Sequence, residues 1–249
     1  MLGLGQSLMS ASALQFSLAD ISGLTAWYKF NEGIFTTEST VTLWNDSSGN
    51  DRHMGNITAT NDRPAFDSSD NTVNFADDKY LELNSTYGTD TNFPNSNEFT
   101  FFAAVRIPFN SGTTQINAVV VGQGTSDNVS IGNLNFLTGS YYAFSGNASD
   151  SNYQNTVSTE TTYPHVNNEL FVIAVRRAGT KLEIMRNARA NVISSTTESN
   201  TSATFDLNTL SHNTASSKVS IAELAVYNSG LSDDDFDLVI NDIKTRVGI

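Results

Sequence analysis

The C-terminal segment 219–248 has the clearest pattern of apolar and polar positions in the chain. Residues 219–227 form an extended and mostly apolar run, which predicts a buried strand. After a break of small and polar residues, Ser232 is followed three positions later by Asp235, which predicts a helix start because the serine hydroxyl can accept a free backbone N–H. Apolar residues then recur at helical spacing until Gly248, a fitting C-terminal stop. The chain is therefore expected to end in a strand, a turn and one helix laid against its sheets.

Alternation of apolar and polar residues predicts strands through most of the remaining chain. The clearest is 98–107, in which Phe99 and Phe101 face one way while Phe102 and Ala104 face the other. Further extended runs predict strands at residues 24–30, 41–44, 116–121, 129–136, 140–144, 170–175 and 181–186. Two more runs, 73–75 and 80–83, flank a pair of aspartates and predict a hairpin. The sequence thus predicts an all-β fold: a two-sheet antiparallel β-sandwich with one C-terminal α-helix, built as a single domain over residues 24–249.

Residues 1–23 are expected to form an extended N-terminal arm. Glycine, serine and small apolar residues dominate this stretch. Residues 11–13 match a signal-peptidase site, but no Lys or Arg precedes them and Gln6 interrupts the apolar stretch, which argues against a secretory signal. Such an arm covers the surface of its own domain or docks on a neighbouring subunit. The apolar residues expected to make these assembly contacts are Leu2, Leu4, Leu8, Leu14 and Phe16.

Composition narrows the range of partners. The 249 residues include no cysteine, so disulfides and thiolate metal sites are unavailable. The formal net charge is -13 and the pI is near 4.4, with Lys and Arg scattered along the chain. These charges disfavour nucleic acid and anionic membranes as partners. No apolar run approaches the roughly 20 residues that span a bilayer, so no membrane insertion is expected.

Catalytic patterns are missing from the sequence. A retaining glycosidase needs two carboxyl groups about 5 Å apart, which alternate positions on a strand would supply, and neither Glu183 nor Glu223 belongs to such a ladder. His53, His165 and His212 are expected in polar loops, and no Gly-x-Ser-x-Gly sequence is present. We therefore expect no catalytic residues and no enzyme activity.

The order of several segments resembles a known fold family. The segments are LTAWYKF at 24–30, WNDSSGN at 44–50, FFAAV at 101–105, FVIAVR at 171–176 and IAELAVYN at 221–228. In this order they resemble the laminin-G-like, concanavalin A-like lectin/glucanase jelly roll over residues 24–249. Where that family has an Asn-Gly hairpin turn this chain has Asn187-Ala188, so we expect a longer loop there. The glycine-rich start and the lack of enzyme motifs also resemble virion structural proteins of tailed bacteriophages.

Two kinds of binding site follow from these observations. Members of the family often carry a structural Ca²⁺ at loop ends, and the candidate ligands here are Asp46, Asp51, Asp77 and Asp78. Short Asp/Asn turns without metal are the alternative. Trp27 and Trp44 are expected in the core. Sugar binding would use exposed aromatic residues beside Asn, and the candidates are Tyr141, Tyr142, Tyr153 and Tyr163, for which core or subunit contacts are equally open.

Three functions remain open at this point. The first is a non-enzymatic virion structural protein, a capsid decoration or tail component, which contacts copies of itself, other virion proteins and a host-surface glycan. Such a protein is assembled in the host cytoplasm and resides in the virion. The second is an extracellular carbohydrate-binding module, either secreted or displayed on a surface. The third is an endo-glycanase.

Overall fold

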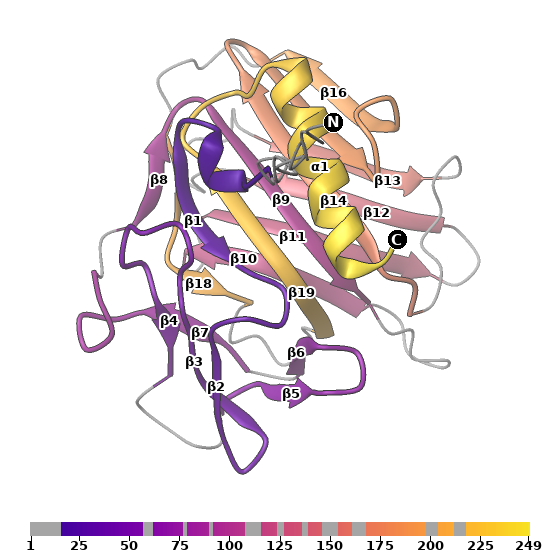
Figure 1. The fold of residues 1–249 in the computed structure, drawn as a ribbon. Coiled ribbons are helices and arrows are strands. Elements are labelled where there is room, and N and C mark those ends of the chain that lie inside the picture. Colours follow the sequence, from indigo (N-terminus) through magenta and orange to yellow (C-terminus); the bar gives the residue numbers. More distant parts are fainter. Residues whose placement is uncertain are drawn as a thin grey trace, which may run out of the picture.

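The computed structural model describes residues 16–56, 62–76, 79–89, 92–107, 116–123, 127–135, 139–145, 154–160, 168–197, 204–211 and 218–249. Over these residues the chain forms antiparallel sheets with one C-terminal α-helix, as predicted (Figure 1). For strands β10 to β13 the structure describes the backbone. Within these four strands, burial is described for Val120 and Gly122 only.

The first layer, here called the helix-side sheet, is built around β9 and β19. Its strands, from one edge to the other, are β16 (Val192–Thr197), β15 (Lys181–Arg186), β14 (Phe171–Ala178), β9 (Phe99–Arg106), β19 (Lys218–Tyr227), and then β1 (Leu24–Tyr28) and β6 (Thr72–Ala76) side by side, with β5 (Ala65–Asp67) outside β6. The long strand β19 pairs with β6 along its first half and with β1 along its second half. It therefore holds both β1 and β6, two strands from the N-terminal third of the chain, in this layer.

The second sheet lies against the first. Its strands in spatial order are β13 (Gln154–Glu160), β12 (Gly139–Ser145), β11 (Asp127–Asn135), β10 (Ile116–Gln123), β18 (Thr209–Leu210), β7 (Leu81–Leu83), β4 (Met54–Gly55), β3 (Thr40–Trp44) and β2 (Ile34–Thr37). A bridge between Thr40 and Ala65 joins the two layers at one side. Strands β8 (Phe93–Ser96) and β17 (Phe205–Leu207) form a separate ribbon.

Strand β9 shows how the sequence produces two apolar layers. Phe101 and Val105 face the second sheet and belong to a cluster that also contains Trp44 and Leu210. The alternate residue Phe102 faces the other way, into a cluster with residues of the helix. Because successive side chains of a strand point to opposite faces, a strand with apolar residues on both faces must be covered on both sides. The facing directions predicted for this strand are confirmed.

Helix α1 (Asp233–Val247) covers the outer face of the helix-side sheet, the face turned away from the second sheet (Figure 1). The Ser232 hydroxyl accepts the N–H of Asp235 at 3.2 Å, and Gly248 ends the helix in a left-handed conformation with φ 80°. The buried side of the helix consists of Phe236, Val239, Ile240, Ile243 and Val247. The predicted helix, its N-cap and its stop are therefore confirmed.

The described part of the expected N-terminal arm packs on the domain. A short 3-10 helix, η1 (Leu18–Asp20), places Leu18 fully buried in the layer between α1 and the sheet. The Tyr227 hydroxyl donates to the Leu18 carbonyl at 3.1 Å, and Phe16 packs against the same layer. Residues 1–15, including Leu2, Leu4, Leu8 and Leu14, lie outside the described residues.

Two loop predictions have different outcomes. The connection between β15 and β16 runs over residues 187–191, so the longer loop expected from Asn187-Ala188 is confirmed. The predicted hairpin of residues 73–75 and 80–83 is wrong. Strand β6 pairs with β5 and β19 in one layer, whereas β7 pairs with β4 and β18 in the other. Most residues of β6 and β7 are buried or half-buried. Burial against different neighbours therefore decides which sheet each strand joins, whatever turn lies between them.

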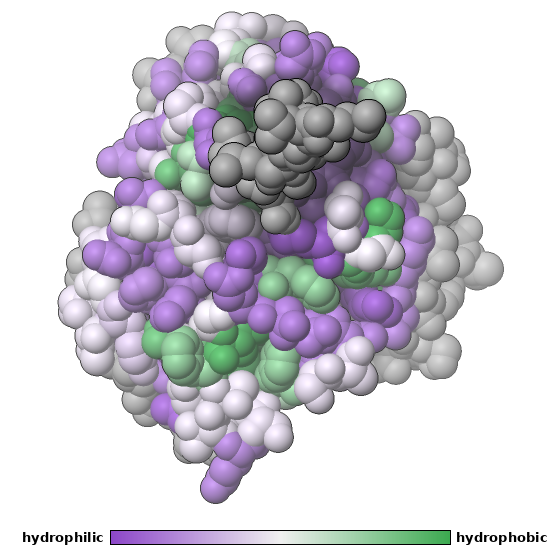
Figure 2. Space-filling model, viewed as in Figure 1, coloured by the Kyte–Doolittle hydropathy of each residue, from purple (hydrophilic) through white to green (hydrophobic). Residues whose placement is uncertain are grey.

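The helix-bearing face of the molecule is mostly hydrophilic, with apolar residues in separate groups (Figure 2). Within the described part of the chain, no helix has the length and apolarity needed to span a membrane.

Candidate functional site

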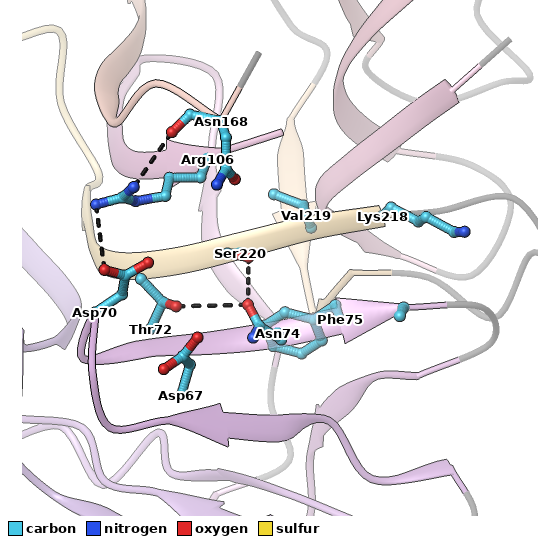
Figure 3. A pocket seen from close by; sticks show the side chains of 11 residues that line it. Asp67, Asp70, Thr72, Asn74, Phe75, Arg106, Asn168, Lys218, Val219 and Ser220 are labelled. Atoms are coloured by element: carbon cyan, nitrogen blue, oxygen red, sulfur yellow. Dashed lines mark hydrogen bonds and ion pairs between the residues drawn. The ribbon is translucent and has the colours of Figure 1, made fainter. Parts of the chain in front are cut away.

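A pocket of about 310 Å³ opens at one end of the helix-side sheet (Figure 3). Its walls come from β6, the start of β19, the end of β9, the turn between β5 and β6, and the residue Asn168 ahead of β14. The lining residues are Asp67, Asp70, Thr72, Asn74, Phe75, Ala76, Arg106, Asn168, Lys218, Val219 and Ser220. Most of them are polar or charged, which sets this end of the sheet apart from the apolar part under the helix.

Strand register explains why polar side chains gather here. Ser220 of β19 pairs with Asn74 of β6 on one side and with Arg106 of β9 on the other. Directly paired residues share a face of a sheet, so the three form a row across three strands. Two positions further along their strands, Ala222 and Ala104 lie in the layer covered by the helix. The row therefore continues the outer face of the sheet beyond the apolar contact with α1.

Hydrogen bonds connect one half of the row. The Ser220 hydroxyl donates to Asn74 Oδ1, and the Thr72 hydroxyl donates to the same oxygen at 3.4 Å (Figure 3). With both hydroxyls directed at Oδ1, the Nδ2 group of Asn74 has no hydrogen-bond acceptor among the described residues. The pocket wall thus presents an amide whose donors remain available.

Arg106 occupies the other half of the row. Its Nη1 donates to the Asn168 carbonyl at 3.2 Å, and its Nη2 lies 3.6 Å from Oδ1 of Asp70 (Figure 3). Its Nε is buried without a hydrogen-bond partner. The guanidinium therefore connects the β5–β6 turn to the residue ahead of β14 while several of its five donors stay unused.

Asp67 and Asp70 place two carboxylates at the pocket. The Ser69 hydroxyl and backbone N–H both donate to Oδ1 of Asp67, at 2.6 and 2.9 Å, and these hydrogen bonds lower the pKa of that carboxyl. Asp67 is thus ionised at neutral pH and accepts hydrogen bonds rather than delivering a proton. A glycosidase acid needs the opposite perturbation, a raised pKa. The arrangement is suited to holding a ligand that both donates and accepts hydrogen bonds.

The loop of residues 45–53 contains two of the residues predicted to bind Ca²⁺. The carboxylate of Asp46 accepts hydrogen bonds from the backbone N–H groups of Trp27, Ser48 and Arg52 and from the Ser48 hydroxyl, at 2.7 to 3.1 Å. The loop in turn donates to carbonyl groups of Leu24 and Thr25, which covers the edge of β1. Asp46 therefore has a structural task that protein donors alone account for.

Asp51 does not join Asp46 in a common cluster. Its side chain is exposed, and Oδ1 lies 3.8 Å from His53 Nε2, while His53 Nδ1 accepts the backbone N–H of Asp46 at 2.9 Å. Asp77 and Asp78 lie outside the described residues. Across the residues that the structure covers, no group of three or more His, Asp or Glu side chains is placed to hold a metal ion. Calcium binding by the four aspartates stays a prediction.

Two of the four predicted glycan-binding tyrosines lie in a described strand of the second sheet. In β12, Tyr141 pairs with Gly132, and Tyr142 pairs with Ile131 and Val157. Tyr153 and Tyr163 lie outside the described residues. Glycan contacts by these tyrosines stay a prediction.

Trp27 and Trp44 are in the core, as predicted, with side chains 6% and 0% exposed. The indole Nε1 of Trp27 donates to Glu223 at 2.7 Å.

Sequence reasoning did not single out the pocket. Arg106 and Ser220 lie in runs that predict buried strands, and Asn74 lies in the run 73–75, predicted as part of a hairpin that does not form. The available signal is the polar positions at the ends of these strands. Only the long-range pairing of β6 with β19 brings these positions together.

The comparisons with known proteins agree on the fold. No protein-family model matches the chain, and no curated protein matches it. Similar solved structures include a botulinum neurotoxin type C chain studied for its interaction with two ganglioside molecules, with TM-score 0.55 and 12% identity, covering 91% of this chain and 52% of that chain. The binding domain of botulinum neurotoxin DC in complex with SialylT has TM-score 0.54 and 15% identity, covering 90% and 52%.

A sialidase is also similar. The Trypanosoma rangeli sialidase in complex with 2,3-difluoro-KDN has TM-score 0.56 and 10% identity, covering 90% of this chain and 33% of that chain. This chain thus spans about half the length of the neurotoxin chains and a third of the sialidase chain. Identities this low carry information on the fold alone. The described chain is a jelly-roll β-sandwich of antiparallel strands with one C-terminal α-helix.

Proposed function

We propose that this chain is a non-catalytic binding domain that holds a saccharide in the pocket around Arg106, Asn74 and Ser220. The observation that carries the proposal is that the pocket wall offers both hydrogen-bond donors and hydrogen-bond acceptors. Asn74 and Arg106 offer unused donors, and the carboxylates of Asp67 and Asp70 offer acceptors. A sugar hydroxyl donates and accepts at once, so it matches such a wall better than a purely anionic or apolar group does.

The size of the pocket supports a small ligand. Its volume of about 310 Å³ lies at the lower end of the roughly 300–1,000 Å³ typical of small-molecule sites. Phe75 lines the pocket but is only 1% exposed, so no aromatic ring is offered for stacking there. We therefore expect one or two sugar residues to be bound with modest affinity, which display in several copies would raise.

The similar structures support the ligand class. Their descriptions name gangliosides, SialylT and a difluoro-KDN, which belong to those proteins. The shared sandwich is thus a scaffold on which sugar ligands occur. At these identities the residues that bind them do not transfer to this chain.

The absence of catalysis is part of the proposal. Hydrogen bonds from Ser69 lower the pKa of Asp67, so Asp67 is not set up as a proton donor at neutral pH. Asp70 lies beside the Arg106 guanidinium. Glu82, whose pKa is raised by burial, belongs to the second sheet and not to this pocket.

The setting that we propose is the virion of a tailed bacteriophage, as a capsid decoration or tail component that contacts copies of itself and a host-surface glycan. The support is the sequence resemblance described above, and a secreted or surface-displayed module is the alternative. Because Leu18 is buried, a deletion that tests the arm should remove residues 1–15 only. We expect the shortened protein to fold and to lose assembly, as measured by native mass; unchanged assembly would remove the support for the arm.

A glycan array tests the proposed binding. We expect wild-type protein to bind at least one saccharide, and Asn74→Ala to weaken that binding about tenfold, since a lost hydrogen bond in a binding site is worth on the order of 1 kcal/mol or more. Asn241→Ala, on helix α1 away from the pocket, is the matched control and should bind as wild type does. No binding to any saccharide, or equal binding by Asn74→Ala, contradicts the proposal. Release of reducing ends from the bound sugar contradicts its non-catalytic part.

A further inference from the structure

Arg106 lies where two separate segments of the chain meet at the pocket. It ends strand β9, and its guanidinium reaches the Asn168 carbonyl on one side and the Asp70 carboxylate on the other. A quarter of its side chain is exposed, against 38% for Asp70. The charge is thus neither sealed in the core nor free in solvent, but part of the pocket wall (Figure 3).

The two oxygen atoms that Arg106 contacts are of the kinds that Ca²⁺ takes. A carboxylate from one loop and a backbone carbonyl from another are typical ligands for that hard cation. Here the Arg106 guanidinium occupies the space between them. The site therefore already contains the positive charge that a metal ion would bring.

The protein supplies the Arg106 guanidinium with only one hydrogen-bond acceptor among the described residues. The separation of 3.6 Å between Nη2 and Asp70 is too long for a hydrogen bond, and the buried Nε has no acceptor. A guanidinium donor without an acceptor is costly in a partly buried place. Nη2 also makes no hydrogen bond with a described residue, so an oxygen atom of a ligand beside Arg106 would accept from Nη2, and a neighbouring hydroxyl would donate to Asp70.

We infer that Arg106 is the built-in cation of this pocket, so that saccharide binding there does not depend on a divalent metal ion. The inference rests on the proposed function and deepens it by naming how the ligand is held. The ligand has two adjacent hydroxyl groups: the oxygen of one accepts from the Arg106 guanidinium, and the other donates to the Asp70 carboxylate. Arg106 is thereby the residue that selects a vicinal diol.

The first test compares metal conditions. Wild-type protein is titrated with a saccharide found on the array, by calorimetry, in excess EDTA and again in millimolar Ca²⁺. We expect the same dissociation constant in both. Loss of binding in EDTA that Ca²⁺ restores would overturn the inference while leaving the proposed function intact. Failure of every saccharide to bind would instead overturn the proposed function.

The second test changes the guanidinium. Arg106→Ala should weaken binding at least about tenfold, because it removes a charge-assisted donor. Arg106→Lys keeps the charge and loses the planar fork of donors, so its affinity should lie between those of wild type and Arg106→Ala. Arg189→Ala, which removes an exposed arginine bound to helix carboxylates, is the matched control and should bind as wild type does. Equal binding by Arg106→Ala would overturn the inference.

A purely structural role for Arg106 gives a different pattern. Titration with deoxy analogues of the bound sugar separates the two roles. If Arg106 contacts the diol, removing one hydroxyl from the sugar should weaken wild-type binding and have little further effect on Arg106→Ala. If removing the hydroxyl weakens binding equally in wild type and in Arg106→Ala, the arginine does not contact that hydroxyl. Thermal unfolding of each variant confirms that it is folded in the titration.

Discussion

The carboxylate of Glu223, fully buried on β19, accepts hydrogen bonds from the guanidinium of Arg246 in the last turn of helix α1. Arg246 Nε lies 3.1 Å from both carboxylate oxygens, and Nη2 lies 2.5 Å from Oε1. The Trp27 indole donates to the same oxygen, and the Arg246 guanidinium lies 5.1 Å from the Trp27 ring centroid. The end of helix α1 is thus fixed to the centre of the sheet through one buried carboxylate.

Removal of Arg246 should be strongly destabilising. Arg246→Met leaves the Glu223 carboxylate buried without its cation, and breaking such a pair typically costs about 3 kcal/mol or more. We expect a loss of about 3 kcal/mol in the free energy of unfolding, measured by urea denaturation at neutral pH. Lys244→Met, two residues earlier on the helix, is the control and should change stability by less than about 0.5 kcal/mol. A loss below about 1 kcal/mol for Arg246→Met would show that the pair is not a principal anchor.

The parts of the fold that sequence predicted are those set by local chemistry. Ser232 and Gly248 delimit the helix through their own capping geometry, and alternation along β9 fixes which residues face each layer. The Glu223–Arg246 pair was not predicted, because a glutamate between Ala222 and Leu224 gives no local sign of its partner on a helix. Long-range partners of this kind depend on how elements dock, which no short segment encodes.

The pocket escaped prediction for the same reason. Asn74 belongs to a run that sequence paired with residues 80–83, whereas the structure pairs it with Ser220 on β19. Arg106 joins them through the other edge of β19. Strand pairing over such separations is chosen by burial of both faces, so the residues of the pocket become neighbours only after the sandwich has formed.

Asp46 provides a second prediction, on the loop that covers β1. Asp46→Ala removes a charged acceptor from the backbone N–H groups of Trp27, Ser48 and Arg52, and hydrogen bonds to charged groups contribute about 1.5–3 kcal/mol each before relaxation. Since water can replace some of these contacts in the exposed part of the loop, we expect a net loss of about 2–3 kcal/mol in thermal unfolding. Asp51→Asn, at an exposed side chain in the same loop, should be nearly neutral, since asparagine also tolerates the positive φ of 54° at this position.

The same experiment separates a protein-donor role of Asp46 from a metal-ligand role. If Asp46 acts through the N–H groups, the cost of Asp46→Ala is the same in excess EDTA and in millimolar Ca²⁺. If it binds Ca²⁺, the ion stabilises wild-type protein and not the variant. A stabilisation by Ca²⁺ that disappears in Asp46→Ala would therefore contradict the role described here.

Glu82 is a residue whose replacement is expected to raise stability rather than to lower it. It lies on β7 opposite Gly55 and Thr209, and its carboxylate makes no hydrogen bond or ion pair with any described residue. Partial burial raises the pKa of its carboxyl above the ordinary value of 4.5. The folded state therefore holds the proton more tightly than the unfolded state, and stability declines as pH rises through the raised pKa. At neutral pH the ionised carboxylate is a net cost to folding.

Replacing Glu82 by glutamine should remove that cost. Because the group is only partly buried and is screened by solvent, we expect Glu82→Gln to stabilise the protein by only about 0.5 kcal/mol in urea denaturation at neutral pH. Well below pH 4.5 the carboxyl is protonated in both states, so the advantage of the variant should vanish there. Glu38→Gln, at an exposed position, is the control and should show no such pH dependence. If Glu82→Gln is instead destabilised at neutral pH, the Glu82 carboxylate has a stabilising partner at this place in the second sheet.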